Sequence, residues 1–332
     1  MPTRYDVLGI GNAIVDVIAR TEDDFLVKHG MHKGTMTLID EPRAEAIYAS
    51  MGPAIETSGG SGANTIAGVA SFGGRAAFVG KVKDDTLGKA FTHDIRAIGV
   101  DFATRPAADG PSTARCYVLV TPDGERTMNT YLGAAQNLAP ADLDAEQIAA
   151  ARYTYLEGYL WDPPQAKEAF RKAATIAHGA GRKVALSLSD AFCIDRYRDE
   201  FLNLMRTGAV DLIFANEGEL KSLYQTADFD SAVKALRSDV KLAAVTRSEK
   251  GCVVVSRESN EAVAAAPIDR MVDATGAGDL FAAGFLIGLA RDQDHRDAAR
   301  LGAIAAAEVI QHLGARPETS LKALAQESGY TI

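Results

Sequence analysis

The chain has 332 residues, of which 47% are hydrophobic and 24% charged, a composition typical of a globular protein with a substantial core. Its net charge of −9 argues against nucleic acid and anionic membranes as partners, because both require clustered Lys and Arg. Three widely separated cysteines predict neither a disulfide framework nor a zinc site. No signal peptide is visible and the most apolar stretch, 280–290, is too short to span a bilayer, so we expect a cytoplasmic protein.

Short β-rich runs alternate with longer helical patterns along most of the chain. The runs that are typical of buried strands are 7–10, 76–79, 153–156, 184–188, 212–214 and 242–245. The helical patterns cover 63–70, 164–179, 230–237, 280–290 and 301–309. Repeated alternation of this kind predicts a largely parallel sheet with helices on both faces.

Two regions interrupt the alternation. The segment from about 16 to 51 is mixed and more polar, and 113–131 alternates on either side of Thr-Pro-Asp-Gly at 121–124, which is typical of a β-hairpin. Such insertions often cover the ligand crevice of an α/β sheet. We therefore predict one domain, 1–332, with a discontinuous lid formed by residues 16–51 and 103–131.

The segment 271–281 carries the clearest chemistry. Gly276, Ala277 and Gly278 allow a turn to approach a ligand closely and to expose backbone N–H groups. An apolar helix follows at once, and its N-terminus favours an anion. This suits phosphoryl transfer, with Asp279 orienting a hydroxyl and accepting its proton. The alternative is an Asp that only caps a buried helix.

Two other nucleotide-binding patterns fail. The dinucleotide fingerprint would begin at Gly9, but Ile14 stands where its third glycine should be. Residues 74–81 have glycines one position too far apart for a P-loop, and Val82 replaces the expected Ser or Thr.

Residues 273–279, Asp-Ala-Thr-Gly-Ala-Gly-Asp, resemble the Asp-Thr-x-Gly-Ala-Gly-Asp motif of the ribokinase-type (PfkB) carbohydrate kinase family, with Ala274 in place of Thr. Residues 59–64 resemble the family's Gly-Gly-x-x-x-Asn, 216–219 its Asn-x-x-Glu, and 246–251 its nucleotide-side motif. The four occur in family order over nearly the whole chain. The resemblance implies a ribokinase-like three-layer α/β/α fold with a small β-rich lid, and a kinase that uses ATP and Mg²⁺.

Within the family, the adenosine kinases are the nearest resemblance. Residues 11–16 are similar to their Gly-Asn-Pro-x-x-Asp opening, although Ala13 replaces the Pro, and residues 187–192 and 214–219 are similar to two further stretches. The expected acceptor is thus a primary hydroxyl, the ribose 5′-OH of adenosine. The alternatives are a ribokinase, fructokinase or 2-keto-3-deoxygluconate kinase, and a non-catalytic nucleoside-binding regulator. Apolar candidates for contact with the base are Leu38, Phe102 and Tyr159.

The resemblance also implies roles for individual residues. Asp279 would be the catalytic base, and Gly276, Ala277 and Gly278 the anion hole. Sugar hydroxyls would be held by Asn12, Asp16, Gly60 and Asn64, whose carboxylate, amide and backbone groups suit adjacent hydroxyls. The ATP side would comprise Asn216, Thr246, Gly251 and, from the hairpin, Arg126. The alternative for Arg126 is a solvated hairpin charge.

Two metal sites are implied as well. Glu219 would hold Mg²⁺ through water, because Mg²⁺ keeps several of its waters. The alternative is that Asn216 and Glu219 form a capping box at a helix start. Asp273 and Thr275 would bind a monovalent cation such as K⁺ through backbone oxygens, or simply form the turn before the helix. Monomer and homodimer both stay open.

Overall fold

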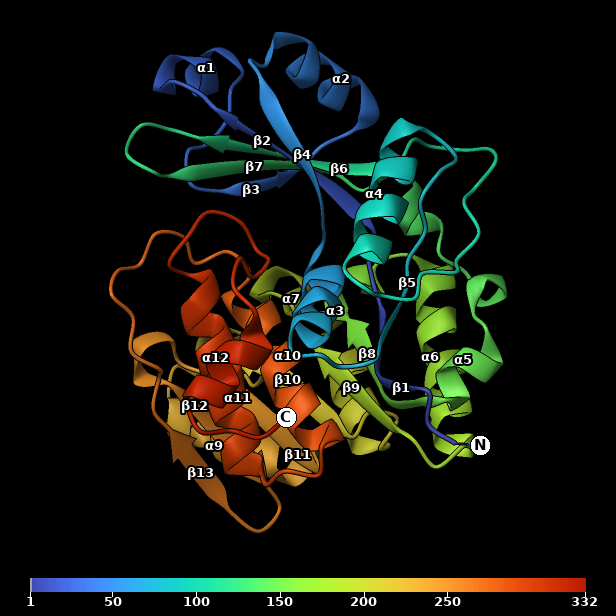
Figure 1. Ribbon diagram of the computed structural model, residues 1–332, viewed down its shortest axis with the longest axis vertical. Helices are drawn as coiled ribbons and strands as arrows, with labels where there is room; N and C mark the ends of the chain where they lie inside the picture. The colour runs from blue at the N-terminus through green and yellow to red at the C-terminus, as the bar shows by residue number, and fades with distance from the viewer. Residues whose placement is uncertain (1) are drawn as a thin grey trace.

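The computed structural model describes residues 2–332, whose strands form two separate sheets (Figure 1). The larger sheet has the order β13-β12-β11-β10-β9-β8-β1-β5. Its strands are β1 (Tyr5–Ile10), β5 (Ala76–Val79), β8 (Ala151–Glu157), β9 (Lys183–Ser187), β10 (Leu212–Asn216), β11 (Leu242–Thr246), β12 (Cys252–Ser256) and β13 (Asn260–Val263). Neighbours from β5 to β11 are parallel, and only β12 and β13 are antiparallel additions. The six predicted strands are confirmed, whereas the β12–β13 hairpin was not predicted.

Helices cover both faces of this sheet. Because successive side chains of a strand point to opposite faces, Val7 belongs to one hydrophobic core and Leu8 to the other. The first face is covered by α3 (Ser61–Ser71), α10 (Ala277–Ala290), α11 (His295–Val309) and α12 (Leu321–Glu327). The second is covered by α5 (Ala145–Ala149), α6 (Pro164–Gly179), α7 (Ala191–Arg206), α8 (Glu217–Leu223) and α9 (Phe229–Asp239). The predicted three-layer α/β/α fold is confirmed.

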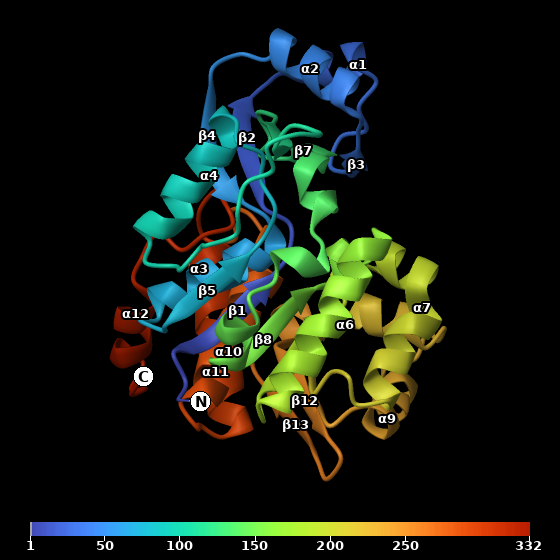
Figure 2. The same ribbon diagram turned by 90° about the vertical axis from the view of Figure 1, so that its right-hand side faces the viewer.

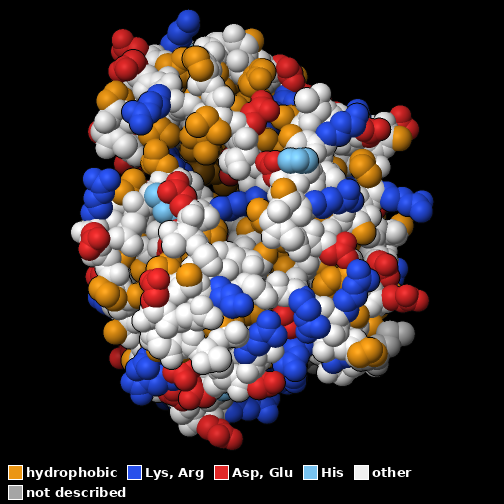
Figure 3. Space-filling view, viewed as in Figure 1, with side chains coloured by type: hydrophobic (Ala, Val, Ile, Leu, Met, Phe, Trp, Pro, Cys, Tyr) orange, Lys and Arg blue, Asp and Glu red, His pale blue; other side chains and the backbone are white. Residues whose placement is uncertain are grey.

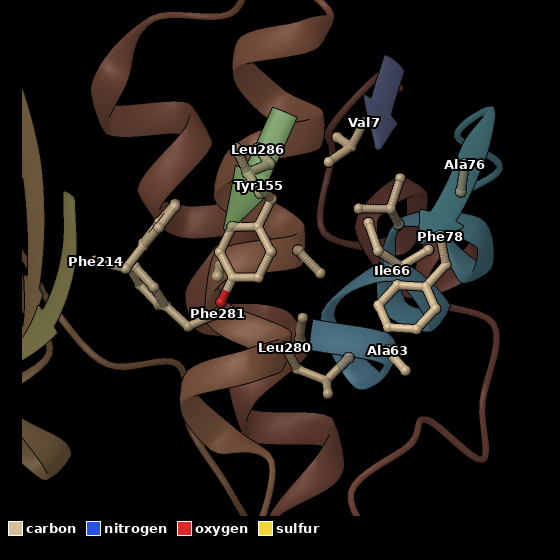
Figure 4. Packing of buried hydrophobic residues seen from close by; sticks show 14 of the residues in the cluster. Val7, Ala63, Ile66, Ala76, Phe78, Tyr155, Phe214, Leu280, Phe281 and Leu286 are labelled. Carbon is tan, nitrogen blue, oxygen red and sulfur yellow. The ribbon is translucent and has the colours of Figure 1, made fainter. Parts of the chain in front are cut away.

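The helix α10 is held firmly in the first core. Leu280 from its first turn lies on the side of α3 and Ile66 in the packing that Figure 4 shows, whereas Phe281 lies on the side of Tyr155 and Phe214. On its other side, a Cβ at Gly284 would lie 2.4 Å from the carbonyl oxygen of Leu301, so α10 and α11 are in backbone contact. The N-terminus of α10 is therefore fixed in place by packing on two sides.

The smaller sheet lies above the carboxyl ends of the parallel strands (Figure 2). Its order is β3-β7-β6-β2-β4, with β2 (Ile14–Arg20), β3 (Met36–Leu38), β4 (Ala54–Gly59), β6 (Ala114–Val120) and β7 (Arg126–Tyr131). The predicted hairpin is confirmed: β6 and β7 are antiparallel, and the N–H of Gly124 donates to the carbonyl of Thr121 (2.8 Å). Strand β4 lies outside the residue ranges predicted for the lid.

One face of the smaller sheet is already covered. Val15 and Val17 of β2 pack with Ala44 and Ile47 of α2 (Glu41–Ser50), and α1 (Asp23–Lys28) lies on the same side. Helix α4 (Thr86–Ala97) contacts β2 and β4 from the flank. The second face is open toward the main body. No helix within residues 2–332 is both long and apolar enough to cross a membrane.

Candidate active site

A cavity of about 1160 Å³ separates the open face of the smaller sheet from the main body. Figure 3 shows the surface hollowed there, with hydrophobic side chains on its upper rim. Its floor is formed where parallel strands end, the usual ligand position in such sheets. The cavity brings together most of the predicted site residues: Asn12, Asp16, Gly60, Asn64, Arg126, Asn216, Glu219, Thr246, Gly251, Thr275, Gly276, Ala277, Gly278 and Asp279. Of the residues to which the sequence analysis gave a catalytic, sugar-binding, ATP or metal role, Asp273 is the one that does not line it.

The turn before α10 has the geometry of an anion site. Gly276 has a φ of 81°, and a Cβ there would lie 2.7 Å from the Cα of Ala315, so both conformation and space require glycine. A Cβ at Gly278 would meet nothing within 4 Å. Packing therefore does not explain that glycine, whereas the approach of a ligand would.

Two N–H groups of this turn are free. The N–H of Ala277 donates to the carbonyl of Ala274 (3.3 Å), but those of Gly278 and Asp279 have no acceptor in the described part of the chain. Unpaired N–H groups of a helix's first turn carry partial positive charge. The free N–H groups are thus those of Gly278 and Asp279, one residue later than the expected anion hole, whose role stays a prediction.

Asp279 points back toward α3. Its Oδ1 accepts a hydrogen bond from the hydroxyl of Ser61 (2.6 Å), and its Oδ2 one from the Nδ2 of Asn64 (3.2 Å). Burial raises the pKa of Asp279 to about 6, while these two hydrogen bonds lower it. The carboxylate is ionised at neutral pH and basic enough to accept a proton. Ser61 was not predicted, although it lies inside the glycine motif.

The open face of the smaller sheet presents two rows of side chains to the cavity. Cross-strand pairing aligns the inner row as Leu38, Thr130, Cys116, Asp16 and Thr57. The outer row, two residues further along each strand, is Met36, Met128, Val118, Ile18 and Ile55. Each row crosses all five strands. The inner row carries a carboxylate, Asp16 on β2, next to its central member Cys116, and the outer row is entirely apolar.

Asp16 is partly buried on β2, between Cys116 and Thr57 of the inner row. Its Oδ2 lies so close to Gly59 that a Cβ there would be 2.1 Å away. Burial raises the pKa of Asp16 to about 6, against the lowering effect of Arg316 and Arg126 and with a raising contribution from Asp279. The cavity is therefore lined by two carboxylates, Asp16 and Asp279, whose pKa values are both raised to about 6.

Glu157, at the end of β8, was missed by the sequence analysis. Its carboxylate is buried and accepts hydrogen bonds from the Nδ2 of Asn12 (2.6 Å) and the N–H of Gly62 (2.7 Å). It thereby joins the loop after β1 to the start of α3. Burial raises its pKa to about 7. The Oδ1 of Asn12 is buried with no partner among residues 2–332, which leaves an acceptor for a ligand hydroxyl.

Arg316, in the loop after α11, was also missed. Its Nη1 donates to the hydroxyl of Ser58 (2.5 Å) and its Nε to the Oδ1 of Asn64 (3.3 Å). Its Nη2 is buried without a partner in the part of the chain that the structure describes. Burial lowers the pKa of Arg316 to about 10, although Asp16 and Asp94 oppose the shift. In the sequence, Arg316 is a single arginine in a loop with few apolar residues, which is a weak signal of a functional site.

Asn216 and Glu219 form the capping box of α8. The Oδ1 of Asn216 accepts from the N–H of Glu219 (2.8 Å), and the carboxylate of Glu219 accepts from the N–H and the Nδ2 of Asn216 (3.0 and 2.6 Å). The capping alternative is confirmed. Burial raises the pKa of Glu219 to about 7. Its carboxylate still lines the cavity, so contact with metal-bound water stays a prediction.

No group of three or more His, Cys, Asp or Glu side chains within 2–332 is arranged to hold a metal ion. Glu219 is a single carboxylate that lines the cavity, and Mg²⁺ usually keeps several of its waters. The water-mediated role that the resemblance implies for Glu219 stays a prediction.

Arg126 and Asp273 are not placed as the sequence analysis expected. Arg126 is buried, and its Nη1 lies 2.7 Å from the Oδ2 of Asp273, so the alternative of a solvated charge is wrong. Asp273 also accepts from the N–H and hydroxyl of Thr275 (3.0 and 2.7 Å) and from the N–H of Gly314 (3.1 Å). Its charge is thus balanced by Arg126, and a monovalent cation at its backbone stays a prediction.

One of the three candidates for contact with a base is wrong. The ring of Phe102 is buried against Phe91 and Phe78, with centroids 5.4 and 6.1 Å apart, and it does not line the cavity. The edge of β5 and helix α4 together enclose it, which local sequence does not reveal. Leu38 and Tyr159 do line the cavity.

Comparison with known proteins matches this geometry. The model of the pfkB family carbohydrate kinases matches residues 54–322. The chain belongs to this family. As a PfkB family kinase it is an ATP-dependent phosphotransferase that acts on a hydroxyl group, and the family usually requires Mg²⁺.

Relatives of this chain include adenosine kinases as well as sugar kinases. The solved adenosine kinase from Sinorhizobium meliloti is 55% identical with a TM-score of 0.93, over 98% of this chain and 100% of that one. A probable sugar kinase protein from Rhizobium etli is 54% identical with a TM-score of 0.93, over 98% and 99%. A probable fructokinase-3 of Arabidopsis thaliana is 30% identical over 81% of this chain and 80% of its own. Adenosine kinases and sugar kinases therefore both stand close to this chain.

Proposed function

We propose that this kinase transfers the γ-phosphate of ATP to the ribose 5′-hydroxyl of adenosine. The observation that carries the proposal is the pairing of two unlike rows on the open face of the smaller sheet. The inner row places Asp16 where ribose hydroxyls can bind, and the outer row offers five apolar side chains beside it. A free sugar has no group for such a surface, whereas a purine covers it.

The body side of the cavity supports the same substrate. Tyr159 lines it, and so does Phe192, which is 62% exposed and lies under the guanidinium of Arg196 at 4.2 Å. An exposed aromatic ring and an apolar strand row that line the same cavity could together enclose a planar base. Enclosing a base in this way removes apolar surface from water on both of its faces.

Asp279 would act as the base in the transfer step. Its carboxylate would accept the proton of the 5′-hydroxyl as the oxygen attacks phosphorus, and the free N–H groups of Gly278 and Asp279 would bind the phosphoryl oxygens. Arg126 adds positive charge at the same place: its Nε and Nη2 are buried without partners in the described chain. Positioning and charge neutralisation are what phosphoryl transfer chiefly needs.

The nucleotide would lie on the far side of α10. That end of the cavity is lined by Thr246, Gly251, Ala265, Ala266, Ala303, Ala306 and Ala307. These small side chains leave room for an adenine ring, and Glu219 of the capping box of α8 would face water on magnesium. We also propose that the smaller sheet acts as a lid over the acceptor.

A sugar acid is the second candidate, and Arg316 is the observation that favours it. A carboxylate could pair with the free Nη2 of Arg316. It would, however, also face Asp16 and Asp279, and like charges in a buried site repel. A neutral nucleoside avoids this repulsion.

An ATP-consumption panel tests the proposal. It would compare adenosine, inosine, ribose, fructose and 2-keto-3-deoxygluconate, with Asp279→Asn as the inactive control. We expect adenosine to have the highest kcat/KM. Efficient turnover of one sugar with none of adenosine would overturn the nucleoside assignment, and full activity of Asp279→Asn would overturn the mechanism.

A near-isosteric substitution sharpens the test. Val118→Thr adds a hydroxyl to the outer row without changing its shape. Because burying an unpaired hydroxyl against an apolar base is unfavourable by about 1–3 kcal/mol, the KM for adenosine should rise about 5- to 150-fold. Any residual turnover of ribose, which does not reach that row, should keep its KM.

A further inference from the structure

Arg316 links three parts of the acceptor side of the cavity. It donates hydrogen bonds to Ser58 on β4 and to Asn64 on α3. Its positive charge lowers the pKa of Asp16 on β2, and the negative charge of Asp16 raises the pKa of Arg316. Asp16 and Arg316 line the same cavity without being an ion pair in direct contact. The Nη2 of Arg316 is buried and has no partner within the described residues. The cavity thus contains a buried donor without an acceptor, the Nη2 of Arg316, and the carboxylate of Asp16 makes no direct contact with it.

The contact with Asn64 has a consequence for the catalytic carboxylate. Because a guanidinium nitrogen can only donate, the atom of Asn64 that faces Arg316 must be its Oδ1. The Nδ2 is then directed to Asp279, to which it donates at 3.2 Å. With the amide turned over, Oδ1 would face the carboxylate of Asp279 and two acceptors would repel each other. Arg316 therefore sets the amide orientation that holds Asp279.

We propose that Arg316 is a specificity-determining residue of the acceptor site: its Nη2 donates to a hydroxyl of the ribose diol that Asp16 binds, and its Nε positions Asp279 through Asn64. A hydroxyl is the group that fits, because it accepts from a guanidinium and donates to a carboxylate at the same time. The neighbouring negative charges of Asp16 and Asp279 disfavour a carboxylate in that place. The inference rests on the proposed nucleoside acceptor.

A substrate–protein cycle tests the hydroxyl contact. Binding of adenosine, 2′-deoxyadenosine and 3′-deoxyadenosine would be measured by calorimetry for the wild type and for Arg316→Met, with Arg300→Met as an exposed arginine control. Hydrogen bonds to charged groups of this kind change affinity about 10- to 100-fold. We expect Arg316→Met to lose that factor for adenosine, and the wild type to lose it for one deoxy analogue. The variant should then show little further loss with that analogue, because the contact is already gone.

The positioning role has its own readout. In Arg316→Met the amide of Asn64 is no longer oriented, so its hydrogen bond weakens and the pKa of Asp279 rises. In the pH profile of kcat, the acid limb should therefore move to higher pH. Arg316→Lys, which keeps the positive charge, should restore part of the affinity for adenosine. The other titratable groups that act on or with Asp279 are Asp16, Tyr155, Glu157, Tyr159 and Glu219, and the substitution leaves them in place.

The outcomes separate the two claims. A wild type that does not bind adenosine overturns the proposed function, and this inference with it. A wild type that binds adenosine, with additive losses for Arg316→Met and both deoxy analogues, overturns the hydroxyl contact alone. An unmoved acid limb overturns the positioning role. Thermal melts and ATP affinity like those of Arg300→Met would show that the variant is folded and that the change is confined to the acceptor side.

Discussion

The Nη1 of Arg126 lies 2.7 Å from the Oδ2 of Asp273, and both side chains are buried. This ion pair joins the first residue of β7 in the smaller sheet to the loop that leads into α10. Together with the contact from the same Nη1 to the hydroxyl of Thr275 (3.4 Å), it links the proposed lid directly to the turn before α10. The partners differ in what else they contact: Asp273 accepts from Thr275 and Gly314, while the Nε and Nη2 of Arg126 are unpaired within residues 2–332.

Removing each partner should therefore have a different effect on stability. Asp273→Asn leaves a buried guanidinium without its counter-charge and should lower the free energy of unfolding by about 3 kcal/mol. Arg126→Met leaves Asp273 with its other donors and should be less destabilising, while it reduces kcat because the phosphate loses a positive charge. Urea unfolding and steady-state kinetics measure the two effects. Equal destabilisation by both variants would contradict this account of the pair.

The two glycines of the turn should respond differently to alanine. At Gly276 the positive φ and the contact with Ala315 predict a loss of more than about 1 kcal/mol of stability together with activity. At Gly278 a Cβ meets no protein atom, so Gly278→Ala should melt at the same temperature or slightly higher. Its kcat should nevertheless fall at least tenfold, because the methyl group occupies the space of the phosphoryl group. An active Gly278→Ala enzyme would argue against a phosphate site at this turn.

The activity should have an acid limb. Asp279 accepts a proton only when it is ionised, and burial raises its pKa to about 6. Asp16, also with a pKa of about 6, binds the acceptor in the same proposal. The value of kcat/KM should therefore rise with pH through about 6 and level off above 7. Asp279→Asn should lower kcat by about 10²- to 10⁴-fold and leave the Kd for ATP little changed. A flat profile from pH 5 to 8 would exclude a titrating base.

The ligand-free protein should be more stable at pH 5 than at pH 8. The folded-state pKa values of Glu157 and Glu219 are raised to about 7 by burial, above their usual 4.5. A raised pKa means that the folded state binds the proton more tightly, so this contribution is complete below about pH 4.5 and is lost as pH rises through 7. The slope is about 1.4 kcal/mol per pH unit for each proton released.

An opposite effect limits the gain at lower pH. Hydrogen bonds from Lys221 and Arg247 hold the pKa of Glu217 at about 2, so its contribution is lost as pH falls toward that value. Melting temperatures at pH 5 and 8 measure the net effect, and Glu157→Gln, which cannot titrate, should flatten the dependence. A higher melting temperature at pH 8 than at pH 5 would show that these carboxyls are not the controlling groups.

Local features of the sequence determined a large part of this protein. The buried strands, helix α6 and the hairpin of β6 and β7 follow from periodicity and turn residues that lie within a few positions of each other. The turn before α10 is also local, because its glycines, the helix start and Asp279 are consecutive. The glycine turn with its following helix and Asp279 could therefore be predicted as a unit, and the family resemblance extended the candidate site to residues at other strand ends.

Only the tertiary structure decided which distant residues complete the cavity. Arg316 reaches Asn64 across 252 positions, and Glu157 reaches Asn12 across 145. Burial of Arg126 depends on Asp273 lying opposite it, and burial of Phe102 on α4 lying over it. Neither an ion pair nor a core contact between separate elements leaves a local pattern, because burial and charge depend on what the fold brings alongside. The turn at 276–279 can be read from consecutive residues; the cavity around it comes from packing.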